Sequence, residues 1–75
     1  MRLSETQINH KYQVDNIHLD EKTINKLHVI GLTKATAIQV LNKNLNGSFI
    51  IKVRGARFAI NKAISKGIEV SHATH

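Results

Sequence analysis

The sequence predicts a small, mainly β protein whose short strands close into a barrel, with one helix between the first strand and the second. Three observations support this fold class. Several short segments of the 75-residue chain alternate apolar and polar residues with the period of a half-buried strand. Glycine and asparagine separate these segments where turns are needed. One longer segment, ahead of Gly31, has helical spacing instead.

The first strand is predicted over residues 12–19, after a polar lead-in over residues 1–9. Its apolar positions form two pairs that are one position out of step, Tyr12 and Val14 and then Ile17 and Leu19. A phase slip of one residue inside a strand indicates a β-bulge, because side chains alternate strictly between the two faces. We expect the bulge near Asp15-Asn16.

The helix is predicted to begin after Asp20, a favourable N-cap, and to carry Glu21 in its first turn, where the helix dipole favours a negative charge. It has an apolar stripe with a spacing near three, Ile24, Leu27 and Ile30. Gly31 is expected to end the helix in the left-handed conformation. Leu32 then packs back on Leu27, as in a Schellman motif.

After a turn over residues 33–35, the second strand is predicted over residues 36–41, with Ile38 and Val40 on one face. A loop over residues 42–47 ends in Asn-Gly, a strong hairpin signal. The third strand is predicted over residues 48–54. Its inward side chains are Phe49, Ile51 and Val53, and its outward side chains are Ser48, Lys52 and Arg54.

Gly55 breaks the third strand, and a short fourth strand follows with one apolar face formed by Ala56, Phe58 and Ile60. Asn61 caps a single helical turn over residues 62–66, which Gly67 ends. Residues 68–70 form the closing strand, and residues 71–75 are expected to be a tail. Residues 1–75 are one domain with a core over about 3–70, and about five strands of this size predict an SH3-like β-barrel.

Composition limits the function. The formal charge is +6 and the isoelectric point about 10.1, which favours acidic partners. Lys52 and Arg54 on one predicted strand face, with Arg57 just beyond Gly55, form the candidate partner-binding residues. A nucleic-acid-binding module is the alternative, but it lacks a stacking platform, because the aromatic residues are Tyr12, Phe49 and Phe58 and both phenylalanines fall on the apolar phase of their strands. The start of the chain has no signal-peptide pattern, and no apolar run is long enough to enter a membrane.

No catalytic pattern is present. The serines lack a nucleophile elbow and the glycines lack the spacing of a phosphate loop, so we expect no enzyme and no cofactor. With no cysteine, metal binding depends on histidines. His72 and His75 are three residues apart, but two imidazoles in a tail make only a weak, adventitious site, and no functional metal is expected. His28 is expected to be an ordinary boundary residue.

The chain resembles the FeoA family through four segments, Leu27 to Thr33, Ile38 to Leu41, Val53 to Gly55 with Ala59, and Gly67 to Val70. The resemblance covers about residues 3–70. It implies an SH3-like fold and a non-enzymatic, cytoplasmic accessory of bacterial ferrous iron uptake. The implied partner is FeoB, a membrane transporter with a GTPase domain, which would hold the chain at the inner face of the membrane. A related domain occurs in iron-dependent repressors, but this chain has no DNA-binding winged helix.

Two positions depart from the family pattern. The turn after Thr33 often contains glycine, whereas here it reads Lys34-Ala35. A proline commonly follows the glycine of the next loop, whereas here Ser48 follows Gly47. These departures affect the geometry of turns and leave the implied function unchanged.

Overall fold

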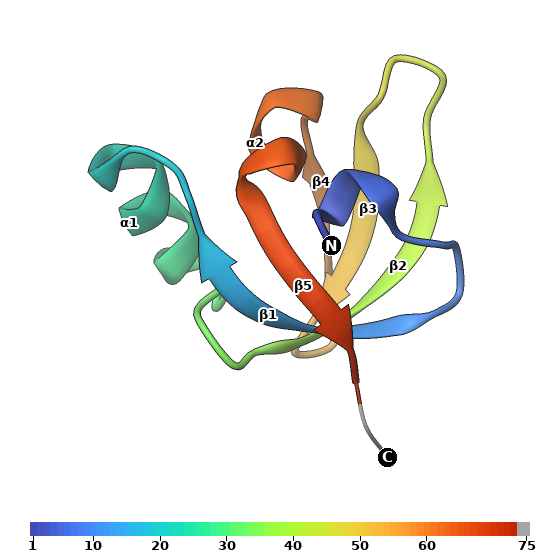
Figure 1. The fold of residues 1–75 in the computed structure, drawn as a ribbon, viewed down its shortest axis with the longest axis horizontal. Coiled ribbons are helices and arrows are strands. Elements are labelled where there is room, and N and C mark those ends of the chain that lie inside the picture. The colour runs from blue at the N-terminus through green and yellow to red at the C-terminus, as the bar shows by residue number, and fades with distance from the viewer. Residues whose placement is uncertain (74–75) are drawn as a thin grey trace.

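Five antiparallel strands form one strongly curved sheet in the order β4-β3-β2-β1-β5, which confirms the predicted SH3-like barrel (Figure 1). The computed structural model describes residues 1–73. Its strands are β1 (Lys11–Ile17), β2 (Ala37–Lys43), β3 (Phe49–Val53), β4 (Ala56–Ile60) and β5 (Ile68–His72). Its helices are α1 (Glu21–Val29), between β1 and β2, and α2 (Lys62–Gly67), ahead of β5. None of the helices in the described residues is long and apolar enough to span a membrane.

The bulge predicted in β1 is present. The register between β1 and β5 shifts between Val14 and Asn16, which returns Ile17 to the side of the core. β1 ends at Ile17, two residues before the predicted end. Leu19 has left the sheet and packs at the margin of the core, against Gly67 of α2. A side chain at Gly67 would place its Cβ 2.9 Å from the His18 carbonyl oxygen, so this glycine is required by close packing.

Both ends of α1 have the predicted caps. The Asp20 side chain accepts a hydrogen bond from the Thr23 amide at 3.3 Å. At the other end Gly31 has a φ of +89°. The Gly31 amide donates to the His28 carbonyl at 3.0 Å and the Leu32 amide donates to the Leu27 carbonyl at 2.9 Å. These two bonds define a Schellman motif, and Leu27 and Leu32 lie together in the core.

The turn between α1 and β2 forms without the glycine that is common there. Ala35 has a φ of +69° and occupies the left-handed region itself. Its amide donates to the Val14 carbonyl at 2.7 Å, and the Thr36 hydroxyl donates to the Gly31 carbonyl at 3.3 Å. The first bond ties the turn to β1, the second ties the end of the helix to the residue ahead of β2, and both offset the strain at Ala35.

The β3–β4 hairpin corrects the predicted third strand. β3 ends at Val53, and Arg54 and Gly55 form a two-residue turn with φ angles of +52° and +84°. Two positive φ values identify a type I′ turn, whose twist matches that of the flanking strands. Arg54 therefore lies in the turn, and the prediction that it shares a strand face with Lys52 is wrong.

The two ends of the described chain are more ordered than predicted. Residues 3–5 form a short 3₁₀ turn, and Leu3 and Thr6 are fully buried although the segment was predicted to be a polar lead-in. β5 continues to His72, so Ser71 and His72, which were assigned to a tail, pair with β1. His75 lies outside the described residues.

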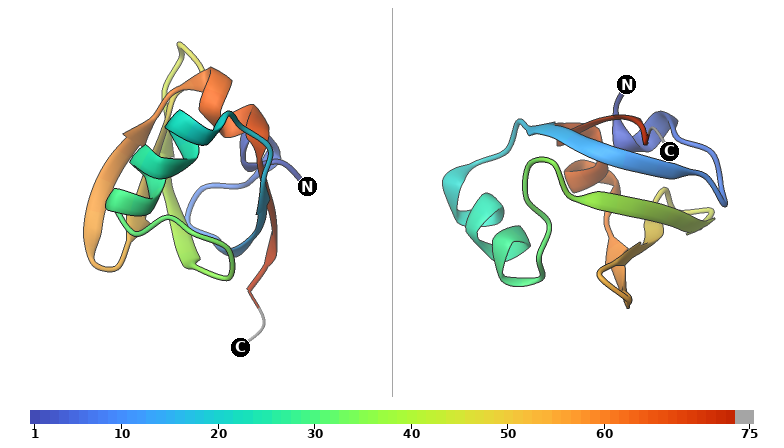
Figure 2. Two further views of the ribbon diagram at one scale, coloured as in Figure 1. Left: turned by 90° about the vertical axis from the view of Figure 1, so that its left-hand side faces the viewer. Right: turned by 90° about the horizontal axis from the view of Figure 1, so that it is seen from below.

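Thirteen apolar side chains form the core inside the curved sheet: Leu3, Tyr12, Val14, Leu27, Leu32, Ile38, Val40, Phe49, Ile51, Val53, Ile60, Ile68 and Val70. They come from every strand, from the 3₁₀ turn, and from α1 and the turn after it. The helix α1 lies beside β1 at one end of the barrel (Figures 1 and 2). Because alternate strand residues fill this core, the residues between them point outward, and this determines the outer surface.

Candidate interaction surface

A row of polar residues crosses the outer face of four strands. Lys11 of β1 pairs with Gln39 of β2, Gln39 pairs with Lys52 of β3, and Lys52 pairs with Arg57 of β4. We call these four residues the basic row. Its three cations are exposed. With neighbouring strands about 4.8 Å apart, the row extends over roughly 15 Å.

Lys52 and Arg57 face each other directly across β3 and β4. In a type I′ hairpin the residues that flank the turn form a hydrogen-bonded pair, and the next pair along is not hydrogen-bonded. Lys52 and Arg57 are that next pair, in which opposite side chains approach most closely. Like charges placed directly opposite in a sheet destabilise it. The Lys52–Arg57 pair is therefore expected to lower the stability of the sheet.

A shallow hollow of about 260 Å³ lies beside the basic row. It is lined by Lys11, Ala37, Ile38, Gln39, Lys52, Arg54 and Gly55. The lining contains no carboxylate. Two lysines and one arginine around one depression create a positive potential at the surface, which attracts anionic groups and raises their rate of encounter.

Arg54 has a structural role as well. A Cβ built on Gly31 would lie 3.0 Å from Arg54 Cδ and 3.1 Å from Arg54 Nε, so the arginine lies across the C-terminal end of α1. The negative end of the helix dipole is there, and a cation beside it is stabilising. Arg54 therefore lies against the end of α1, whereas neither Lys52 nor Arg57 forms an ion pair within residues 1–73.

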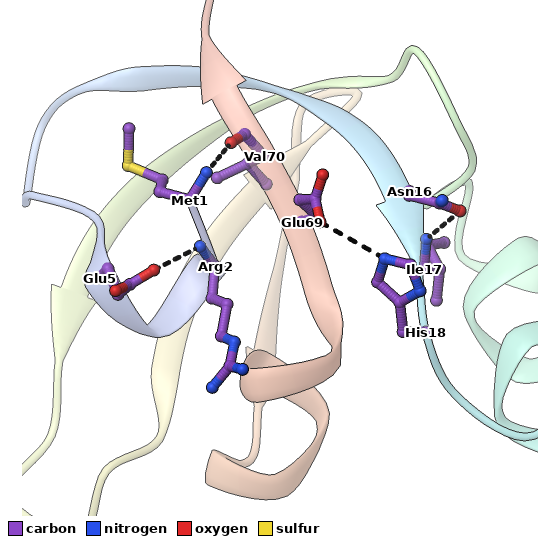
Figure 3. Close-up of polar contacts among 8 residues, drawn as sticks. All are labelled: Met1, Arg2, Glu5, Asn16, Ile17, His18, Glu69 and Val70. Atoms are coloured by element: carbon purple, nitrogen blue, oxygen red, sulfur yellow. Dashed lines mark hydrogen bonds and ion pairs between the residues drawn. The ribbon is translucent and has the colours of Figure 1, made fainter.

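The carboxylates lie away from β2, β3 and β4. The sequence has none from residue 22 to residue 68, and its five acids are Glu5, Asp15, Asp20, Glu21 and Glu69. Glu69 of β5 lies 3.4 Å from the Nε2 atom of His18, as Figure 3 shows, and both side chains are more than half exposed. Asp15 accepts from the Ser71 hydroxyl at 3.0 Å. The strands β2, β3 and β4 therefore carry cations and no acid, whereas the acids lie on β1, β5 and the N-terminal ends of the chain and of α1.

His72 lies close to His10, a histidine that the sequence did not single out. The rings of His10 and His72 are 6.3 Å apart, and the Tyr12 ring is 5.0 Å from that of His72. Strand pairing brings them together, since His72 is opposite Tyr12. No cluster of three metal-ligating side chains is found in residues 1–73. His28 is exposed on α1, beside the hollow described next.

A second hollow, of about 380 Å³, lies between α1 and β1 and was not predicted. It is lined by Asn16, Ile17, Ile24, His28, Thr33 and Lys34. Ile17 and Ile24 are only partly buried, so the interface between α1 and β1 is open at this hollow. Two large apolar side chains are strongly exposed elsewhere, Val29 at the end of α1 and Leu45 in the β2–β3 loop.

The predicted partner-binding residues are thus partly brought together. Lys52 and Arg57 share one outer face, while Arg54 lies in the adjoining turn. Lys11 and Gln39 complete the row and were missed, because their positions depend on the register between strands. The sequence indicated an orientation for each residue, since Lys11 precedes the inward Tyr12 and Gln39 lies between the inward Ile38 and Val40, but it did not show that they are neighbours.

A family model described as the FeoA domain matches residues 1–72 of the chain. The comparison with curated proteins found no match. Among solved structures, the crystal structure of an iron uptake regulatory protein, FeoA, is 37% identical with a TM-score of 0.86, covering 97% of this chain and 96% of that one.

Two NMR structures are also similar. A FeoA-like protein from Clostridium acetobutylicum is 25% identical with a TM-score of 0.84, covering 100% of this chain and 88% of that one. A FeoA protein from Chlorobium tepidum is 20% identical with a TM-score of 0.90, covering 99% of this chain and 71% of that one. The last comparison supports the fold alone.

Proposed function

Because this chain belongs to the FeoA family, we propose that it binds and regulates a FeoB-type ferrous iron transporter at the cytosolic face of the membrane. At the coarser level it is an accessory protein of iron uptake and not an enzyme.

The basic row carries the proposal. Lys52 and Arg57 lie opposite each other at a cost in stability, beside a hollow with no carboxylate in its lining. Exposed like charges in this arrangement are typical of a surface that meets an acidic partner. They steer encounter and make association sensitive to salt. The barrel is small, with an accessible surface of 4770 Å² in all, so the available contact is at the low end of specific interfaces and the affinity is expected to be weak.

A double charge reversal, Lys52→Glu with Arg57→Glu, tests the surface. The matched control reverses Lys22 and Lys66, two exposed lysines on α1 and α2, and changes the net charge by the same amount. Arg54 is left unchanged because it contacts Gly31. We expect the first variant to fold, to lose most crosslinking to the transporter in membranes and to slow ferrous uptake. The control variant is expected to behave like the unaltered chain.

Equal loss in both variants would mean that net charge alone matters, and no loss in either would place the interface elsewhere.

The competing function is nucleic-acid binding, which the positive surface also favours. Its stacking groups are missing from this surface, since Tyr12 and Phe49 are buried and Phe58 packs against the core. A mobility shift with bulk RNA and DNA separates the two. Tight binding that falls steeply with salt, with no capture of the transporter, would favour nucleic acid.

A further inference from the structure

The two edges of the sheet differ in how their backbone groups are used. At the β5 edge, the Val70 amide donates to the Met1 carbonyl at 2.6 Å. The Met1 ammonium donates to the Val70 carbonyl at 2.9 Å, as drawn in Figure 3. The backbone of Arg2 forms an isolated antiparallel β-bridge with Glu69 beside them. The first residues of the chain thus cover this edge. At the other edge, β4 pairs only with β3, and no part of residues 1–73 lies alongside its outer side (Figure 2, left).

The backbone groups that β4 leaves free follow from the hairpin. Val53 and Ala56 flank the two-residue turn and form a hydrogen-bonded pair, and the pairs alternate from there. The pair of Lys52 and Arg57 is therefore not hydrogen-bonded, and neither is the pair of Ile50 and Ala59. The amides and carbonyls of Arg57 and Ala59 point away from β3. The β5 edge follows the same rule, since the outward groups of Val70 are those that bond Met1.

Charge limits what can pair with this edge. Arg57 lies on β4 directly opposite Lys52 of β3, and the sequence has no acid from residue 22 to residue 68. A second copy of the chain joined through β4 would place arginines near one another, which is unfavourable. An extended segment whose outward side chains are acidic would place its carboxylates beside Arg57. It would also gain main-chain hydrogen bonds to Arg57 and Ala59.

We propose that the free edge of β4 binds an extended acidic segment of a partner protein as a sixth strand, with Arg57 and Lys52 contacting its carboxylates. The inference rests on the proposed function, because it specifies the kind of transporter segment that would bind. β4 carries no proline and is exposed at Arg57 and Ala59, so added pairing is sterically open. A charged residue on an edge strand, such as Arg57, can also serve only to prevent aggregation. If that were its sole role, no peptide would bind at this edge.

The probe is a capped ten-residue peptide that alternates glutamate and valine, added to the 15N-labelled chain. Two peptides serve as controls, one with lysine in place of glutamate and one N-methylated along the edge that would face β4. We expect amide exchange at Arg57 and Ala59 to slow about tenfold when nine-tenths of the chain is bound, while Phe58, already bonded to β3, stays unchanged. Both control peptides are expected to have no such effect.

A matched pair of variants tests the same edge from the side of the protein. Ala59→Pro removes the outward amide without breaking a bond to β3, and edge strands tolerate proline at such positions. Ala59→Val keeps the amide. We expect the first to abolish peptide binding and the second to retain it. If Ala59→Pro does not fold, the N-methylated peptide makes the same test on unaltered protein.

The outcomes separate this inference from the proposed function. Alternating protection at Arg57 and Ala59 supports the strand site, and it does so even if the transporter is not captured, in which case the proposed function fails alone. Capture of the transporter without peptide binding overturns the strand site and leaves the function standing. Shifts spread over the basic row without alternating protection, with this peptide, RNA or anionic vesicles, would also overturn it, because they indicate nonspecific attraction.

Discussion

Replacing Gly31 with alanine tests the junction on which the fold depends. Gly31 has a φ of +89° and ends α1 in a Schellman motif. An L-residue in the left-handed region is disfavoured by about 1–2 kcal/mol. Loss of flexibility in the unfolded chain offsets about 0.4–1 kcal/mol of this. The added Cβ would also lie 3.0 Å from Arg54 Cδ, but the arginine is a flexible side chain and is able to shift.

The net loss is therefore roughly 1 kcal/mol, which corresponds to a fall in Tm of about 4–8 °C for a domain of this size. Thermal and urea unfolding of Gly31→Ala measure it. The same substitution in an Arg54→Ala background separates the two causes, because a smaller loss there would be the contribution of the contact with Arg54. An unchanged or higher Tm would refute the reasoning, since it would mean that Gly31 is not held in the left-handed region.

The remaining stability predictions concern three other local features. Ala35 has a φ of +69°, so Ala35→Gly is expected to raise Tm slightly, the opposite sign to Gly31→Ala, and a fall in a thermal melt would contradict this. Gly67→Ala is expected to lower stability by about 1–3 kcal/mol in urea unfolding although alanine favours helix, because its Cβ would meet Leu19 and the His18 carbonyl. The Thr23 hydroxyl lowers the pKa of Asp20 below its ordinary 3.8. The capping contribution is therefore complete above that value and is lost as pH falls through the lowered one, a dependence that Asp20→Asn should remove from acid melts.

The elements that the sequence predicted well are set by local chemistry. Asp20 and Asn61 cap their helices, and Gly31 stops α1, through bonds between residues no more than five apart. The β1 bulge was visible as a change of phase in a single strand. In each case a residue type has few alternatives at its position, so the pattern along the chain was sufficient.

The elements that were missed depend on distant parts of the chain. Ser71 and His72 give no apolar signal and join β5 only because β1 lies beside them. Leu3 looked like part of a polar segment until the barrel buried it completely. Arg54 was placed in a strand because arginine is an uncommon residue in the left-handed positions of a hairpin turn. The basic row required the register of three strand pairs, which no single segment contains.

One substitution is expected to move stability and binding in opposite directions. Lys52→Glu converts a like-charge pair with Arg57 into an attractive one, and such cross-strand pairs are worth about 0.2–1 kcal/mol each. We therefore expect a Tm about 1–8 °C higher at low salt, with the gain reduced at high salt. Crosslinking to the transporter should weaken, because a cation of the proposed surface is replaced by an anion. A lower Tm would show that Lys52 and Arg57 are not in contact. A higher Tm with unchanged binding would show that the repulsion at this pair serves no partner, and the basic row would then be no more than a solvated surface.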